Sequence, residues 1–347
     1  MAQKVTHWLL ISLILSLGFG QLLRLEYLGV PIYLHDILVV LILLSWFLQG
    51  QALQVRQFNL RGLALLGAGL TLGWISALLH YPFTQLLVPF LYTLRLLAYL
   101  ALYLVLKKSK LLIPSFYFLL AGLTTLLIGL VQYIALPDMR VFQYLGWDDH
   151  LNRLTLPHFD PTFTSVMLGL FLLSLSPKLW YFSVLTFISI LLTYSRSVWL
   201  SLIFTGLMFI KNKKILLISG VLVLMSLFAL PQKFGEGNNL LRTYSISSRL
   251  STDVNIIKNT GWNLVIGQGM NTFPRNSINN SYLYLLATTG VIGLTGWVMF
   301  MISLYQKSLH KPMLIFFFIA SLFNNVMFYP FALLWVLLTE FMAPSAT

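Results

Sequence analysis

Cysteine is absent from this chain of 347 residues, and acidic residues are scarce, with nine Asp and Glu against 22 Lys and Arg. The absence of cysteine excludes a disulfide framework and any metal site built on thiolates. Charged residues make up only 9% of the chain, whereas 58% of it is hydrophobic and the mean hydropathy is +0.84. This balance excludes soluble and disordered proteins and indicates an integral membrane protein.

The net charge of +13 at pH 7 is also typical of proteins that bind nucleic acid. Here, however, the basic residues are scattered between apolar spans and form no continuous patch, so we expect no nucleic-acid partner. The sequence also has no His and Asp cluster with the spacing of metal ligands. We therefore expect neither a metal nor a cofactor.

Apolar runs alternate with short polar connections and divide the chain into about twelve spans, judged by the ~20 residues that a bilayer requires. We predict an all-α fold, a single polytopic membrane domain over 1–347. The first span resembles a signal peptide but has no small-residue cleavage site, so we expect it to be retained. The predicted spans are 7–23, 31–49, 62–80, 85–106, 111–135, 162–176, 178–195, 197–210, 214–230, 281–305, 312–326 and 328–343.

Lysines and arginines are sorted between alternate connections. One set carries Lys4, Lys107, Lys108, Lys110, Lys178, Lys211, Lys213, Lys214, Lys307 and Lys311. The other carries Arg24, Arg140, Arg153, Arg196, Arg242, Arg249 and Arg275. The positive-inside rule places the lysine side, and with it both termini, in the cytoplasm. Guanidinium is a planar fork that binds phosphate through two hydrogen bonds, so the outer arginines suggest a ligand that carries phosphate.

Two outer segments are too long and too polar to be simple turns. They are the outer loop 137–161 and the outer loop 231–280. Loops of this length in a compact protein are usually functional, so we expect the site beneath them. Within the second loop, Ser247–Asn259 predicts a helix that Ser247 or Ser248 caps.

Two short motifs occur near these loops. Ser195-Arg196-Ser197 forms a tight outer turn that holds an arginine at the membrane surface. The stretch Gly267–Phe273 contains Gly-x-Gly but lacks the third glycine and the preceding strand of a dinucleotide fingerprint. Its two glycines therefore predict a tight turn.

From Asn279 onward the chain resembles the O-antigen ligase and O-antigen polymerase superfamily of bacterial envelope glycan enzymes. The ligase pattern is His, then Asn, Ser or Gln, nine residues, Gly, two residues, Gly, and Leu or Thr. Asn280, Gly290, Gly293 and Leu294 match it. The similarity covers most of the chain, is densest over 137–300, and has a core region at 162–300 that includes the second outer loop. It extends to the Ser195-Arg196 turn, to Gly267–Phe273, and to the stretch from Trp147-Asp148-Asp149-His150 to Arg153.

The resemblance implies a glycosyltransferase of lipopolysaccharide or other polysaccharide biosynthesis. Such an enzyme moves a saccharide from undecaprenyl pyrophosphate to an acceptor glycan or lipid A core. The reaction takes place at the outer face of the bacterial cytoplasmic membrane, among membrane lipids. The resemblance also implies that outer arginines hold the pyrophosphate. We accordingly expect Arg196, Arg249, Arg153 and Arg275 to bind substrate, and Asn279, Asn280 and Arg249 to lie in the catalytic centre.

The chain departs from the ligase pattern at Asn279, where the ligases have His. Asparagine cannot act as a general base, because its amide only forms hydrogen bonds. Three alternatives follow. The acceptor is activated by another group, or the chain is a divergent, polymerase-type member, or it is catalytically inactive. The outer groups available as substitutes are His150, His158, Asp160 and Asp253.

Arg95 and Asp36 are the charges of opposite sign that fall inside predicted spans. An intramembrane arginine is costly and needs a partner inside the protein. We expect Arg95 either to pair with Asp36 or to bind the lipid phosphate directly. The alternative function is a membrane transporter of a small anion, which would be expected to carry intramembrane charges and broken helices at the midplane.

Overall fold

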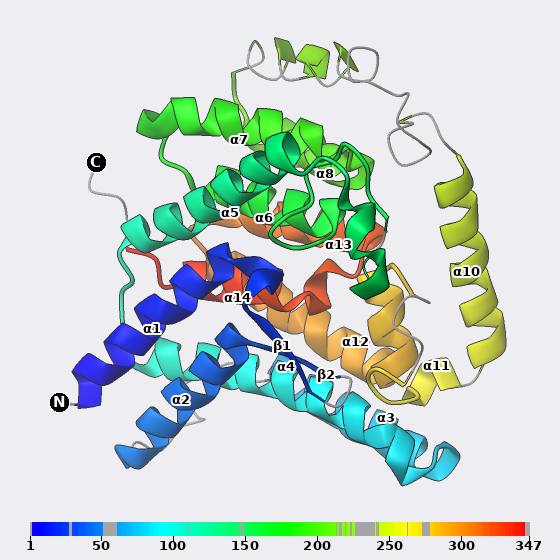
Figure 1. The fold of residues 1–347 in the computed structure, drawn as a ribbon. Coiled ribbons are helices and arrows are strands. Elements are labelled where there is room, and N and C mark those ends of the chain that lie inside the picture. Colours follow the sequence, from blue (N-terminus) through cyan, green and yellow to red (C-terminus); the bar gives the residue numbers. More distant parts are fainter. Residues whose placement is uncertain are drawn as a thin grey trace.

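The computed structural model describes residues 2–27, 30–50, 61–109, 111–145, 147, 149–212, 214, 217–218, 220–222, 224–225, 240, 243–261, 263–272 and 278–343. These residues are mostly helical (Figure 1). The helices of the first half are α1 (Ala2–Gly18), α2 (Leu34–Leu48), α3 (Arg61–His80), α4 (Phe83–Ser109), α5 (Ser115–Ala135) and α6 (Pro161–Ser174). Those of the second half are α7 (Trp180–Leu192), α8 (Arg196–Phe209), α10 (Tyr244–Thr260), α11 (Asn263–Ile266), α12 (Ser281–Lys307), α13 (Lys311–Phe323) and α14 (Pro330–Thr339).

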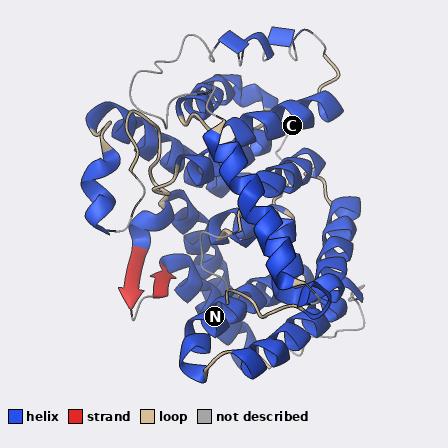
Figure 2. Ribbon diagram, turned by 90° about the vertical axis from the view of Figure 1, so that its right-hand side faces the viewer, coloured by secondary structure: helices blue, strands red, loops and turns tan. Residues whose placement is uncertain are grey.

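Short 3-10 helices and one hairpin complete the secondary structure of the described residues. The 3-10 helices are η1 (Gly20–Leu23), η3 (Met139–Leu145), η4 (Pro177–Leu179) and η6 (Val326–Phe328). The strands are β1 (Arg24–Tyr27) and β2 (Val30–Tyr33), which pair antiparallel with Arg24 opposite Tyr33 (Figure 2).

Four of these helices, α3, α4, α5 and α12, are long and apolar enough to cross a membrane. The shorter apolar helices are α1, α2, α6, α7, α8, α13 and α14. Each of these elements coincides with a predicted span, while the predicted span 214–230 lies mostly outside the described residues. The helical fold is thereby confirmed, and the number of membrane crossings stays a prediction.

The predicted spans 7–23 and 31–49 were wrong at the ends that face each other. Helix α1 ends at Gly18, and helix resumes only at Leu34, with η1 and the hairpin between them. The chain turns at Gly20, which has φ 54°, and the backbone N–H of Gln21 donates to the carbonyl of Pro157 at 2.9 Å. The chain therefore leaves the helix where it contacts a distant loop, and the local pattern of apolar residues does not indicate that contact.

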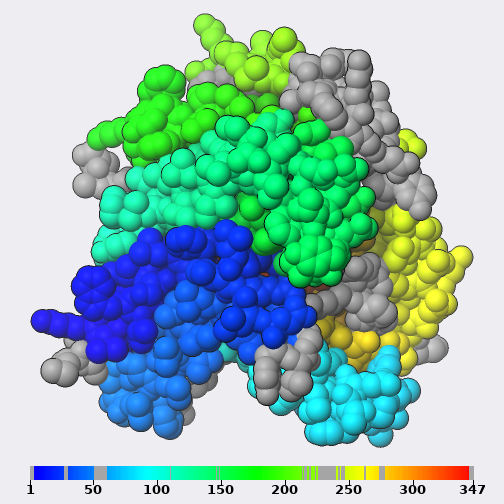
Figure 3. All heavy atoms as spheres, viewed as in Figure 1, coloured from blue at the N-terminus to red at the C-terminus, as the bar shows by residue number. Residues whose placement is uncertain are grey.

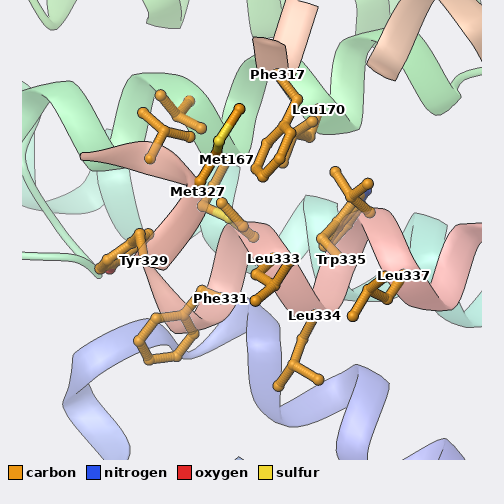
Figure 4. Close-up of a cluster of buried hydrophobic side chains, with 14 of the residues drawn as sticks. Met167, Leu170, Phe317, Met327, Tyr329, Phe331, Leu333, Leu334, Trp335 and Leu337 are labelled. Atoms are coloured by element: carbon orange, nitrogen blue, oxygen red, sulfur yellow. The ribbon is translucent and has the colours of Figure 1, made fainter. Parts of the chain in front are cut away.

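Helix α14 forms the centre of the core. From Phe331 to Thr339 each of its side chains is buried, and the helix packs against α1, α4 and α6. Figure 4 shows Phe331 and Leu334 pointing to the N-terminal helices, while Met167 and Phe317 pack from the other side. With 10 residues α14 spans about 15 Å, about half of an apolar bilayer core. It is therefore enclosed by protein, and its N-terminal end lies inside the molecule.

Small residues let α3 and α12 approach closely. A Cβ atom at Gly69 would contact the backbone of Gly293, and one at Gly62 would lie 2.6 Å from the backbone nitrogen of Phe300. Glycines at helix contacts allow backbones to approach and are common between membrane helices. Helices α3 and α12 are consequently packed backbone to backbone along this contact.

Helix α12 is kinked at Gly290, whose backbone has φ 68° and ψ −176°. The kink leaves carbonyls of the preceding turn without helical partners. Those of Ala287 and Thr288 instead accept the N–H groups of Gln268 and Gly269, each at 3.0 Å. The Gly-x-Gly segment, with φ 91° at both glycines, is thus a tight turn, as predicted, and it fits against the kink.

Two of the lysine-bearing connections, those after α4 and α12, meet near the end of α14. The N–H of Ile113 donates to the carbonyl of Phe341 at 2.8 Å, and Ser308 Oγ donates to Glu340 Oε1 at 2.6 Å. Lys108 Nζ lies 5.5 Å from the ring centre of Trp46, near the end of α2. The sorting of all ten lysines to the cytoplasmic side stays a prediction.

Helix α10 lies along the outside of the molecule (Figure 1). The helix predicted at Ser247–Asn259 is confirmed, but its start and its cap were wrong. The helix begins at Tyr244, so both serines lie within it, and Thr243 at the N-cap position makes no side-chain capping bond. The side chain of Arg249 instead fixes this helix to α13, because its Nη1 donates to the carbonyl of Phe323 at 3.0 Å.

Candidate functional site

A cavity of about 410 Å³ opens between the hairpin, α4, the first outer loop, α12 and the connection from α13 to α14. Figure 3 shows the segment that contains β1 beside the first outer loop, on the face toward the viewer. The cavity is lined by Gln21, Arg24, Tyr33, Tyr92, Arg95, Leu96, Tyr99, Trp147, Phe159, Asp160, Phe163, Met270, Asn271, Tyr284, Asn325, Phe328, Tyr329, Pro330 and Leu333.

Aromatic rings form much of the cavity wall. Trp147 stacks on Phe159 with 4.3 Å between ring centres, and Phe163 stacks on Tyr329 at 4.1 Å. Stacked pairs hold their rings in fixed orientations. Such rings offer flat apolar faces, edged with tyrosine hydroxyls, to a ligand that is apolar on one face and polar at its rim. Sugar rings have this character.

Arg24 lines the cavity from β1, and its positive charge is paired with the carboxylate of Glu26. Its Nη2 donates to Glu26 at 2.6 Å, and its guanidinium lies 4.8 Å from the ring centre of Trp147. The hairpin is therefore tied to the first outer loop by a cation–π contact.

Arg95 reaches the cavity from α4 and pairs with Asp36, as one of the two predicted alternatives stated. Its Nη2 donates to Asp36 Oδ2 at 2.8 Å and to the carbonyl of Pro31 at 2.6 Å. The hydroxyl of Tyr99 donates to the other carboxylate oxygen, and the N–H of Tyr33 donates to Oδ2 at 3.0 Å. A half-buried charge pair with this many hydrogen bonds fixes the hairpin against α4.

Asp160 is the acidic residue among the described lining residues, and it also caps α6. Its Oδ1 accepts the N–H groups of Thr162 at 2.6 Å and Phe163 at 2.9 Å. No hydrogen bond of Oδ2 is present within the described part of the chain. The cap holds the side chain in place and leaves one carboxylate oxygen for the cavity.

Arg196 and Arg249 come together next to this carboxylate. The pKa of the Arg249 guanidinium is lowered, mainly by burial and further by the positive charge of Arg196. The negative charges of Asp160 and Asp253 act in the opposite direction. Burial in turn raises the pKa of Asp253, while Arg249 lowers it. Two guanidinium groups from distant segments thus influence each other electrostatically, and neither of them lines the cavity.

The connection after α13 links these arginines to the cavity. The carbonyl of Phe323 accepts from Arg249, Asn324 Nδ2 donates to Ser197 Oγ at 2.9 Å, and Asn325 lines the cavity. Asn325 Oδ1 is buried and has no hydrogen-bond partner among the described residues. Arg196 itself begins α8 and donates to the carbonyl of Leu240 at 2.9 Å.

A buried polar network lies directly behind the wall. The hydroxyl of Tyr329 and His158 Nδ1 are 2.7 Å apart, and Gln21 Nε2 donates to the carbonyl of His158 at 2.6 Å. Burial lowers the pKa of His158 to about 3, with a further contribution from His35. His158 is therefore neutral at ordinary pH and fixes the tyrosine that faces the cavity.

Two other predicted substrate-binding arginines are placed differently. Arg153 is buried and donates through Nε and Nη2 to the carbonyl of Thr193, at 3.0 and 2.8 Å, so it holds the turn before Arg196. It does not line the cavity. Arg275 lies outside the described residues, as do Arg242 and Asp148.

The two asparagines predicted for the catalytic centre lie near the cavity without lining it. Asn280 is the N-cap of α12, and its Oδ1 accepts from Tyr282 at 2.9 Å and Leu283 at 3.1 Å. Asn279 precedes it and is partly exposed. The capping bonds give Asn280 a structural reason to be polar.

Sequence reasoning missed most of the cavity wall. The aromatic residues Tyr33, Tyr284, Phe163 and Tyr329 come from apolar helices or their ends, where tyrosine and phenylalanine are ordinary. Among the aromatic lining residues, Trp147 was named from the sequence, and among the charged ones Arg24, Arg95 and Asp160 were.

Within the described residues, no group of three His, Asp or Glu side chains is arranged to hold a metal ion. A scan against models of known protein families found no match, and a search of curated proteins found none either. Chemically, the cavity can enclose a ligand with polar and apolar faces and place a carboxylate against it, and the two guanidinium groups outside its wall add positive charge nearby.

Proposed function

We propose that the chain is a glycosyltransferase of the O-antigen ligase and polymerase type. It moves a saccharide from undecaprenyl pyrophosphate to an acceptor glycan or lipid A core. In this proposal the protein crosses the bacterial cytoplasmic membrane about twelve times, with both termini in the cytoplasm and the cavity at the outer face.

One observation carries the proposal: the connection after α13 joins an aromatic cavity to Arg249 and to the turn that holds Arg196. Arg196 and Arg249 influence each other electrostatically. Arg249 donates to the carbonyl of Phe323, and Ser197, the neighbour of Arg196, accepts from Asn324, next to Asn325 of the cavity wall. The aromatic wall suits a sugar, and the arginines suit a diphosphate, which are the two parts of a lipid-linked saccharide.

The segments that resemble the superfamily also converge here, although they are far apart in sequence. Three of these segments contribute a residue to the cavity wall, namely Trp147, Met270 and Tyr284. The fourth segment, the Ser195-Arg196-Ser197 turn, is joined to the wall by the hydrogen bond from Asn324 to Ser197. A convergence of this kind supports a common site for these motifs.

In the proposed reaction, the pyrophosphate leaves with growing negative charge. Fixed guanidinium groups in a sheltered site stabilise that charge without reorganising. Arg196 also occupies the first turn of α8, where helix N–H groups favour an anion. Stabilising the departing pyrophosphate is thus the role that we assign to Arg196 and Arg249.

The test compares Arg196→Lys, Arg249→Lys and Arg140→Lys at equal expression, with the glycan product as the readout. Lysine keeps the charge but loses the two-pronged hydrogen bonding. The first two variants should lose about a hundredfold in rate, roughly 3 kcal/mol of transition-state stabilisation. Arg140 is exposed and pairs with Asp138 in the first outer loop, so its variant should be normal. Normal product from Arg196→Lys and Arg249→Lys would contradict the proposal.

A transporter of a small anion is the second candidate. It is favoured by the break in α12 at Gly290 and by the charged pair Arg95–Asp36 beside the cavity. Sulfate or phosphate uptake into proteoliposomes that contain the purified protein would support it. Protein-free liposomes of the same lipid supply the matching control.

A further inference from the structure

With asparagine at position 279, the proposed transfer lacks a general base at the position of the ligase histidine. Another group must take the proton from the acceptor hydroxyl, and it must lie within hydrogen-bond reach of that hydroxyl. The cavity wall is therefore the place to look.

We infer that Asp160 is the general base of the proposed transfer reaction, accepting the proton of an acceptor sugar hydroxyl within the cavity. This inference rests on the proposed function and adds to it the residue that activates the acceptor.

Position and geometry favour Asp160. It is the acid among the described lining residues, and both capping bonds of α6 fall on Oδ1. Oδ2 is therefore available, while the cap keeps the carboxylate from rotating away. No ion pair within 4.0 Å neutralises this carboxylate in the described part of the chain.

The same carboxylate lies close to the proposed leaving-group site. Asp160 raises the pKa of Arg249, which shows that their charges interact although they form no direct ion pair. A base must stand near the reacting carbon, and the arginines must stand at the departing pyrophosphate. In a displacement these groups act on opposite sides of the carbon, so they must be neighbours without pairing, and Asp160 and Arg249 form no ion pair within 4.0 Å.

The other acids and histidines meet these conditions less well. His158 is completely buried and reaches the cavity only through Tyr329. Asp36 is in the cavity's charged pair and already accepts from Arg95, Tyr99 and Tyr33. His150 and Asp253 do not line the cavity.

The step that follows is a single displacement. The acceptor oxygen forms a bond to the anomeric carbon of the donor sugar, and the bond from that carbon to the pyrophosphate oxygen breaks. The electron pair of the broken bond leaves with the pyrophosphate, beside Arg196 and Arg249. The hydroxyl proton goes to Oδ2 of Asp160, so that charge and atoms balance.

The test is Asp160→Asn in the full-length protein, reconstituted in lipid. Asparagine caps a helix about as well as aspartate, so the fold should be retained while the base is lost. General bases contribute roughly a hundredfold to ten-thousandfold, and we expect product formation to fall by a hundredfold or more. The rise in melting temperature caused by undecaprenyl pyrophosphate should remain, because the arginines are intact.

Asp138→Asn is the matched control, because it makes the same change at an exposed site of the same loop. A lower melting temperature of Asp160→Asn would require a second variant, Asp160→Ser, which also supplies a capping oxygen. This variant must lose product formation to the same degree while its melting temperature stays normal. Transfer at the wild-type rate by Asp160→Asn, or by a stable Asp160→Ser, overturns the inference alone. The absence of transfer by the wild-type protein overturns the proposed function and the inference together.

Discussion

At the scale of single residues, the pair of Arg95 and Asp36 is the clearest case in which charge alone predicted a contact. Their sequence positions lie far apart, and nothing local links them. Two opposite charges inside apolar spans nevertheless had to be compensated within the protein. The sequence did not reveal that Tyr99, Tyr33 and the carbonyl of Pro31 complete the hydrogen bonding, because these are ordinary residues of their segments.

Replacing one member of this pair should lower the free energy of unfolding more than replacing both. Arg95→Leu leaves the carboxylate of Asp36 half-buried without its partner, which typically costs about 3–5 kcal/mol of stability. The double variant Arg95→Leu/Asp36→Leu removes the stranded charge and should recover part of the loss. Thermal unfolding in detergent measures both, and a double variant as unstable as the single one would show that the two charges do not interact.

His158 should make the fold sensitive to acid. Its pKa falls from 6.5 to about 3 on burial, so the unfolded chain binds a proton first as the pH drops. The stabilisation is complete above pH 6.5 and is lost progressively as the pH falls toward about 3. Melting temperatures between pH 7 and pH 5 should therefore decline less steeply in His158→Asn than in the wild type. Parallel curves for the two proteins would contradict this assignment.

At the scale of elements, the contact between α3 and α12 depends on which face of α3 carries each glycine. A Cβ atom at Gly69 meets the backbone of Gly293, whereas at Gly67 nothing lies within 4 Å. The two positions belong to one helix and differ by two residues, so they form a matched pair.

Gly69→Ala should lower stability by about 1–3 kcal/mol, because backbone atoms cannot move aside as a side chain can. Gly67→Ala should be neutral or stabilising by up to about 1 kcal/mol, since alanine favours helix. Differential scanning of both proteins in the same detergent compares them directly. Equal effects at the two positions would mean that the helices do not approach as closely as described.

The helices themselves were predictable because long apolar runs alternate with short polar connections along the chain. The hairpin and the kink in α12 were not predictable in the same way. The turn at Gly20 depends on the carbonyl of Pro157, and the kink at Gly290 is completed by Gln268 and Gly269. Both features are fixed by contacts between distant segments, which a local hydrophobic pattern does not encode.

At the scale of the whole molecule, the sorting of Lys and Arg indicated two ends with different tasks. The structure brings the connections after α4 and α12 together near the end of α14, and the assignment of the two sides to cytoplasm and exterior stays a prediction. The sequence named two residues of the cavity wall, Arg95 and Asp160, while the binding role of Arg196 and Arg249 stays a prediction. The aromatic wall emerged only once the loops and helix ends were arranged around one cavity.

The membrane orientation can be tested without removing any native cysteine, because the chain has none. Single cysteines at Lys178 and Lys307 should be protected from an impermeant thiol reagent in intact cells, and one at Asn255 on α10 should be labelled. All three positions are exposed, so burial does not explain protection. Labelling of Lys178→Cys or Lys307→Cys from outside would reverse the assigned sides.

The central claim is that this protein transfers a lipid-linked saccharide, and transfer by the purified protein tests it most directly. The protein is reconstituted in liposomes with the undecaprenyl-pyrophosphate-linked saccharide and acceptor isolated from the cells that produce it. Extended glycan and free undecaprenyl pyrophosphate should then appear in equal amounts, without added metal or nucleotide. Intact donor after prolonged incubation, together with anion uptake by the same liposomes, would contradict the account and identify a transporter.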